Sequence, residues 1–132
     1  MKYPIVIELG NDTEAHAVYI PDLEVSTAGD TIEDCYTSAI EASKEELGNF
    51  LRSGRKIPMP SSADAIISRD EYKGMSIGMI DIDITPYLGK VEKITISVPS
   101  SVIAMIDKHV IDYGIKSRSA FITDACINAI RQ

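Results

Sequence analysis

The sequence lacks several features that would point to a membrane, a metal or a secretory route. It holds no apolar run of about 20 residues, which is the length that spans a bilayer. Its start, Met1 to Pro4, lacks the apolar segment of a signal peptide, so we expect a cytoplasmic protein. There are only two histidines and two cysteines, and the cysteines form no C-x-x-C motif. We therefore expect no cofactor or metal, and two buried, reduced thiols at Cys35 and Cys126.

Motifs of common catalytic sites are also missing. Neither of the common Gly-rich phosphate loops occurs, and His16 and His109 have no nucleophile pattern nearby. Nuclease chemistry with two metal ions needs several converging carboxylates. The acidic residues that such a site would draw on are Asp81, Asp83, Asp12, Asp22 and Glu8. Acidic residues at alternate strand positions more often form a solvated face, so we predict that the protein is not an enzyme.

Charge is unevenly distributed along the chain. Residues 1–89 hold 16 acidic and 7 basic residues, a net charge of −9. Residues 90–132 hold 4 acidic and 6 basic residues, a net charge of +2. The first part should repel DNA and attract a cationic partner, whereas the second part is locally basic. The commoner alternative is that an acidic surface only keeps a protein soluble.

Residues 1–85 combine several strand patterns with one long helical pattern, which predicts a small domain of α+β class. Strands are expected at 3–9, 15–20, 25–28 and 75–84. In the last strand, alternation places Ile80, Ile82 and Ile84 on one face and Ile77 and Met79 on the other. The strands should form a small antiparallel sheet packed on the long helix.

The long helix is expected to run to Arg52, where Gly54 ends it. The residue pairs with capping-box spacing at its start are Asp30 with Glu33 and Thr31 with Asp34. Helical spacing is kept by Ile32, Tyr36, Ala39, Ile40, Ser43, Leu47, Phe50 and Leu51. An extended loop follows at 56–62, and Ser62 is placed to cap a short helix over 63–68.

Near the carboxyl end, residues 93–98 alternate as a strand with one apolar face. The apolar side chains are Ile94, Ile96 and Val98, and the polar ones are Lys93, Thr95 and Ser97. Pro99 should end this strand, because it cannot donate to a neighbouring strand. Ser100 or Ser101 can then cap a helix.

Two helices are expected after this strand. The first has Ile103, Ile106, Val110 and Tyr113 on one face. Gly114 can adopt the left-handed conformation that stops it, with Ile115 completing a Schellman motif. Ser117 should cap the second helix. Its inner face is expected to carry Phe121 or Ile122, Ala125, Cys126, Ala129 and Ile130.

A unit of one strand and two helices, about forty residues long, is too small for a stable core, so we expect a homodimer. Two copies of the strand would pair antiparallel into a ribbon of a width that fits the major groove of DNA. Lys93, Thr95 and Ser97 would then contact base edges, while Ser117, Arg118 and Ser119 would contact a phosphate. A helix-turn-helix DNA-binding unit is the alternative, but that fold needs three helices, and only two are expected between Pro99 and Gln132.

Residues 92–130 resemble the ribbon-helix-helix repressor family, in which strand, helix, junction and helix follow in this order. The preceding half resembles the HicB family of antitoxins at four stretches, namely 19–23, 27–31, 57–62 and 80–84. Together the two resemblances cover nearly the whole chain. They divide it into a HicB-like domain at 1–85, a linker at 86–91 and a ribbon-helix-helix domain at 92–132.

The resemblance to HicB antitoxins implies a reduced ribonuclease-H-like fold for the first domain. It also implies that this domain masks the RNA site of a small basic toxin, HicA, which cleaves mRNA. Asp22 and Glu24 are the toxin contacts that it suggests in this sequence. The second domain would repress the operon by binding operator DNA, as a dimer or a tetramer, with no part in a membrane. The alternative is a free-standing repressor whose acidic domain binds a small ligand or only oligomerises.

Overall fold

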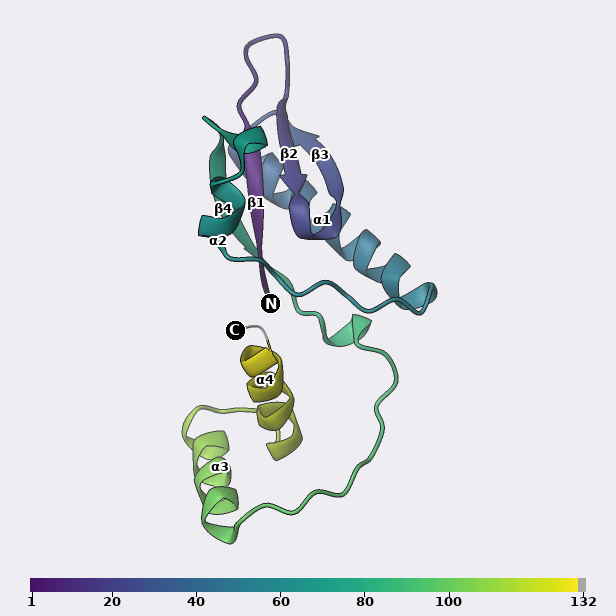
Figure 1. The fold of residues 1–132 in the computed structure, drawn as a ribbon, viewed down its shortest axis with the longest axis vertical. Coiled ribbons are helices and arrows are strands. Elements are labelled where there is room, and N and C mark those ends of the chain that lie inside the picture. The colour runs from purple at the N-terminus through teal and green to yellow at the C-terminus, as the bar shows by residue number, and fades with distance from the viewer. Residues whose placement is uncertain (131–132) are drawn as a thin grey trace. The chain divides into compact units, whose positions relative to one another are not determined.

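The chain forms two compact units, of which the first is built on a four-stranded antiparallel sheet. The computed structural model describes residues 1–130, with one unit from Met1 to Lys90 and the other from Val91 onward. The sheet order is β3-β2-β1-β4. Its strands are β1 (Lys2–Glu8), β2 (His16–Ile20), β3 (Val25–Gly29) and β4 (Ser76–Asp81) (Figure 1). The predicted α+β class and the antiparallel sheet are confirmed.

Strand β1 lies in the interior of the sheet, between β2 and β4. Its side chains from Tyr3 to Ile7 are buried on both faces, whereas Leu9 lies beyond the strand and is 61% exposed. Strand β4 is an edge strand and shows the predicted alternation. Ile80, together with Ile82 and Ile84 beyond the strand, is buried, while Ile77 and Met79 are more than a third exposed.

Helix α1 (Ile32–Arg52) covers one face of the sheet. Of the two possible caps, the structure uses Thr31, whose Oγ1 accepts a hydrogen bond from the Asp34 N–H at 3.1 Å. Its buried side chains are Cys35, Ala39, Ser43 and Leu47. Ser53 closes the helix, and Gly54 follows with a φ of +70°, the left-handed conformation that glycine adopts without strain.

The other face of the sheet is partly covered by α2 (Ala63–Ile67) and by the 3₁₀ turn η2 (Asp70–Tyr72) (Figure 1). Ser62 caps α2 as predicted, because its Oγ accepts from the Ala65 N–H. Two further 3₁₀ turns are η1 (Pro21–Leu23), between β2 and β3, and η3 (Thr85–Tyr87), after β4. Tyr3 of β1 holds the loop at 56–62, because its hydroxyl donates to the Pro58 carbonyl at 2.7 Å.

The second unit consists of α3 (Ser100–Asp112) and α4 (Arg118–Ile130), joined by the predicted junction. Gly114 has a φ of +61°, its N–H donates to Ile111, and the Ile115 N–H donates to the Val110 carbonyl at 2.9 Å. These bonds form the Schellman motif. The predicted cap of α3 by Ser100 or Ser101 is wrong. The helix begins one residue earlier, so that Pro99 is its N-cap and no side chain caps it.

None of the described residues of the second unit is buried in the single chain. His109 lies between Tyr113 and Phe121, with ring centroids 4.4 and 5.1 Å away, and so joins α3 to α4. Cys126 is exposed, so the prediction that both thiols are buried holds only for Cys35. Ile130, expected on the inner face of α4, is 67% exposed.

The segment 91–99 forms no strand in the single chain. A strand is defined by hydrogen bonds to a neighbour, and residues 91–130 contain no second strand to pair with. The expected ribbon therefore stays a prediction. Within residues 1–130, none of the helices combines the length and the apolar content that a membrane crossing needs.

Candidate functional sites

The residues predicted to contact base edges, Lys93, Thr95 and Ser97, are all exposed. The apolar side chains that alternate with them are exposed too, since Ile94 is 78% and Ile96 is 56% accessible. An apolar strand face of this kind is normally covered in a stable protein. The alternating polar and apolar side chains of this segment are therefore both exposed in the single chain.

The start of α4 has the geometry expected of a capped helix. The Ser117 hydroxyl accepts from the Ala120 N–H at 3.0 Å, and the Ser117 carbonyl accepts from the Phe121 N–H at 3.1 Å. The N–H groups of the first helical residues have no acceptor within their own helix, so Arg118 and Ser119 present donors to an incoming anion. Ser117, Arg118 and Ser119 thus lie together at one helix end.

The Arg118 side chain has a partner that the sequence did not reveal. Its Nε donates to Oδ1 of Asp107 at 3.0 Å, and its Nη2 donates to Oδ2 at 2.9 Å. The pair joins α4 to α3 at the surface. The hydrogen bond from Arg118 lowers the pKa of the Asp107 carboxyl, and the same bond raises the pKa of the guanidinium. Both groups are therefore charged at neutral pH.

In the first unit, the two residues predicted to contact a partner differ in their surroundings. Asp22 already uses both carboxylate oxygens, because Oδ2 accepts from the Ser61 N–H at 2.8 Å and Oδ1 accepts from the Ser61 hydroxyl at 2.6 Å. These bonds tie η1 to the loop at 56–62. Glu24, by contrast, is exposed and forms the C-cap of η1 with a φ of +55°. A left-handed conformation is uncommon for a residue other than glycine.

Glu24 lines a surface hollow of about 360 Å³, which we term the tyrosine hollow. Its lining includes Tyr19, Arg69 and Tyr72. The two tyrosine rings have centroids 6.3 Å apart, and the Tyr19 hydroxyl donates to Glu8 at 3.2 Å. That hydrogen bond raises the Tyr19 pKa, so the hydroxyl stays protonated at neutral pH. The tyrosine hollow therefore offers aromatic faces beside the carboxylate of Glu24 and the guanidinium of Arg69.

The carboxylates considered for a metal site have other surroundings. Asp22 is bound to Ser61. The Asp83 carboxylate accepts from the Thr85 N–H, and its pKa is lowered by the Thr85 side chain and, to a smaller extent, by that N–H. Asp81 accepts from the amino group of Met1 at 3.0 Å. Within residues 1–130, no group of three or more His, Cys, Asp or Glu side chains is arranged to hold a metal ion.

Comparison with known proteins gives the family. Residues 3–126 match the family described as the HicB_like antitoxin of bacterial toxin-antitoxin systems. The chain belongs to the HicB-like antitoxin family. It is 32% identical over 132 residues to an uncharacterized 14.9 kDa protein in the rep-hol intergenic region of Haemophilus phage HP1 (strain HP1c1), and the match covers 98% of each chain.

Solved structures of HicB antitoxins have the same fold. The Burkholderia pseudomallei antitoxin HicB matches with a TM-score of 0.75 and 26% identity, over 98% of both chains. The antitoxin HicB3 matches with a TM-score of 0.66 and 27% identity, also over 98% of both chains. A complex of HicB3 with the toxin HicA3 matches over 63% of this chain and 99% of that one, with a TM-score of 0.51 and 28% identity.

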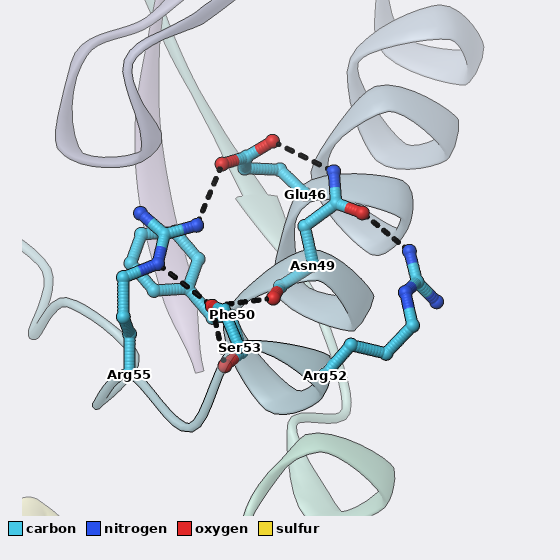
Figure 2. Close-up of polar contacts among 6 residues, drawn as sticks. All are labelled: Glu46, Asn49, Phe50, Arg52, Ser53 and Arg55. Atoms are coloured by element: carbon cyan, nitrogen blue, oxygen red, sulfur yellow. Dashed lines mark hydrogen bonds and ion pairs between the residues drawn. The ribbon is translucent and has the colours of Figure 1, made fainter.

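One polar network of this HicB-like antitoxin was missed from the sequence. At the end of α1, the Arg55 guanidinium lies 4.1 Å from the centroid of the Phe50 ring, and its Nε donates to the Ser53 hydroxyl at 2.8 Å (Figure 2). Glu46 lies 3.8 Å from Arg55 and accepts a hydrogen bond from Asn49 at 3.2 Å. The network links side chains at the end of α1 to Arg55, which follows the helix. The signal available in the sequence was the presence of three basic residues, Arg52, Arg55 and Lys56, within five positions of an acidic half.

Proposed function

We propose that this HicB-like antitoxin inhibits a small, basic, HicA-like toxin through its first unit and represses its own operon through its second. The observation that carries the first part is the net charge of −9 on residues 1–89, which complements the surface of a protein that binds RNA. The complex of HicB3 with HicA3 supports a toxin partner of this kind. Inhibition would come from covering the RNA site of the toxin.

The tyrosine hollow is the surface that we propose for the toxin contact. An arginine or lysine of the toxin that entered it would meet the ring faces of Tyr19 and Tyr72 and the exposed carboxylate of Glu24, beside an Arg69 that lies 3.9 Å from the Glu71 carboxylate. A cation over an aromatic face adds about 0.5–2 kcal/mol, depending on how far it is desolvated. Asp22 would act indirectly, because its hydrogen bonds to Ser61 hold the adjoining loop.

For the second unit, we propose a ribbon-helix-helix dimer formed through residues 93–98. Its support is a set of exposed apolar residues, which a second copy would cover, in a unit where none of the residues up to Ile130 is buried. In the dimer, Lys93, Thr95 and Ser97 would contact base edges in the major groove. Ser117, Arg118 and Ser119 would hold a phosphate, and two dimers on adjacent half-sites would make a tetramer.

Co-expression with the product of a small reading frame next to the gene tests the toxin part. We expect that the full chain restores growth and co-purifies with that product. Glu24→Lys should weaken both effects, because it places a positive charge beside the toxin cation. Glu41→Lys is the matched control, since it makes the same charge change at an exposed site on α1. A chain that neither restores growth nor forms a complex would refute the proposal and leave the free-standing repressor.

Binding to the DNA upstream of the gene tests the repressor part. Lys93→Ala should weaken specific binding by about 1–3 kcal/mol and relax the sequence preference at one position. A variant that bound this DNA and a scrambled duplex with the same affinities as the unchanged protein would refute the base-contact role.

A further inference from the structure

The ion pair between Arg118 and Asp107 bears on how strongly the second unit binds DNA. We propose that Asp107 competes with the DNA phosphate for the Arg118 guanidinium and thereby weakens DNA binding. This inference rests on the proposed repressor function. It adds Asp107 to the residues that affect DNA binding, although Asp107 itself would contact neither a base nor a phosphate.

The geometry of the pair supports competition. The Nε and Nη2 groups of Arg118 form the planar fork that binds carboxylate and phosphate groups in the same two-point manner. Both hydrogen bonds of that fork are used by Asp107, at 3.0 and 2.9 Å. A phosphate at the start of α4 must therefore displace the Asp107 carboxylate or accept bonds from the remaining edge of the guanidinium.

Exposure makes the displacement feasible. The side chains of Arg118 and Asp107 are 54% and 45% accessible, and ion pairs in such positions contribute little to stability because water screens them. DNA carries a dense row of phosphates, so it can compete for the guanidinium. The carboxylate would remain close to the phosphate after displacement, and the repulsion between the two would persist.

Few other cations are free to compensate. Residues 91–130 contain four basic side chains, of which Arg118 is paired with Asp107 and Lys108 lies 3.5 Å from Asp112. No ion pair within residues 1–130 involves Lys93 or Lys116. Residues 90–132 of each protomer thus bring a net charge of only +2 to DNA, and the state of one guanidinium changes it substantially.

The size of the effect follows from counterion release. If a freed Arg118 neutralises one more phosphate in each protomer, the slope of log K against log salt steepens by about 0.9 per protomer. When the salt concentration falls from 1 M to 0.1 M, this added slope raises the affinity for DNA about eightfold more per protomer than in the protein whose Arg118 stays paired. Asp107→Asn should therefore bind DNA more tightly, above all at low salt.

The test measures DNA binding of the full chain by fluorescence anisotropy over a salt series. The probes are a duplex from the region upstream of the gene and a mixed-sequence duplex. Asp107→Asn should tighten binding to both and steepen the salt slope, because a phosphate contact is independent of sequence. Asp124→Asn, at an exposed site on α4, is the matched control for the change in total charge and should have a smaller effect.

A double substitution separates competition from a structural role. In an Arg118→Ala background, Asp107→Asn should no longer steepen the salt slope, because no guanidinium remains to be freed. In the unchanged protein, the NMR signal of the Arg118 Nε–H should shift when DNA is added, which tests the displacement without any substitution. Equal gains from Asp107→Asn and Asp124→Asn, weaker binding by Asp107→Asn, or an unshifted signal would each overturn the inference.

The outcome also separates this inference from the function on which it rests. Absence of salt-dependent DNA binding by the unchanged protein would refute the repressor function and the competition with it. Normal binding by the unchanged protein, with no gain from Asp107→Asn, would refute only the competition.

Discussion

Ser43 has a buried hydroxyl for which the structure provides no hydrogen-bond partner. It lies in the middle of α1, on the helix face that also buries Cys35, Ala39 and Leu47. A buried polar group without a partner loses its hydration and gains nothing in return. Replacing Ser43 by alanine should therefore stabilise the first unit, although the substitution removes an atom from the core.

The expected gain can be worked out from three contributions. Relief of an unsatisfied hydroxyl is worth about 1–3 kcal/mol. Alanine is also the better helix former, by a few tenths of a kcal/mol up to about 0.7. The space left by one oxygen atom costs only a few tenths, at about 24 cal/mol per Å³ of cavity. The net stabilisation of Ser43→Ala is thus about 1–3 kcal/mol, or at least about 4 °C in Tm for a unit of this size.

Urea and thermal unfolding followed by circular dichroism would measure this gain. Ser38→Ala is the matched control, because Ser38 lies on the same helix but is only half-buried. It should give the helix-propensity part alone. Equal effects of the two substitutions would show that the Ser43 hydroxyl finds a partner in solution, and the reasoning from its burial would then fail.

Further substitutions test the two contacts that hold the loop at 56–62. Burial, with a smaller contribution from Asp22, raises the Tyr3 pKa from 10.0 to about 12. Stability should therefore be complete below pH 10 and fall by roughly 1–3 kcal/mol as the pH rises towards 12, since the unfolded chain loses this proton first. Urea unfolding at several pH values should show that Tyr3→Phe removes this part of the loss, and an unchanged profile would contradict the assignment. Asp22→Ala should cost about 1.5–3 kcal/mol, and a double-mutant cycle with Ser61→Ala should show strong coupling, whereas additive effects would contradict the tie between η1 and the loop.

Local patterns in the sequence were sufficient for much of the fold. The alternation of Ile80, Ile82 and Ile84 correctly marked the buried face of the fourth strand, because strand periodicity is a property of the backbone. Gly114 and Ser117 were placed correctly for a similar reason, since helix ends are determined by a few neighbouring residues. The cap of α3 was the exception, because Ser100 lies one position inside the helix.

The polar contacts of the candidate sites could not be predicted from local sequence patterns. Asp22 and Ser61 are 39 positions apart, and Asp107 and Arg118 are 11 apart, so no periodicity relates either pair. Only the folded chain shows that Asp22 is hydrogen-bonded to Ser61 while Glu24 is exposed. The exposed Cys126 has a different cause, because the sequence predicts a helix face but does not say which molecule covers it.

None of the described residues of the second unit is buried, and this has a consequence for how the protein depends on its own concentration in the cell. A unit that completes its core only with a second copy has a stability that depends on protein concentration. Each tenfold dilution would cost a dimer about 1.4 kcal/mol, whereas the first unit, with its own core, would be unaffected. Within the proposed function, toxin binding would then persist at low copy number, while repression would begin only above a threshold concentration of antitoxin.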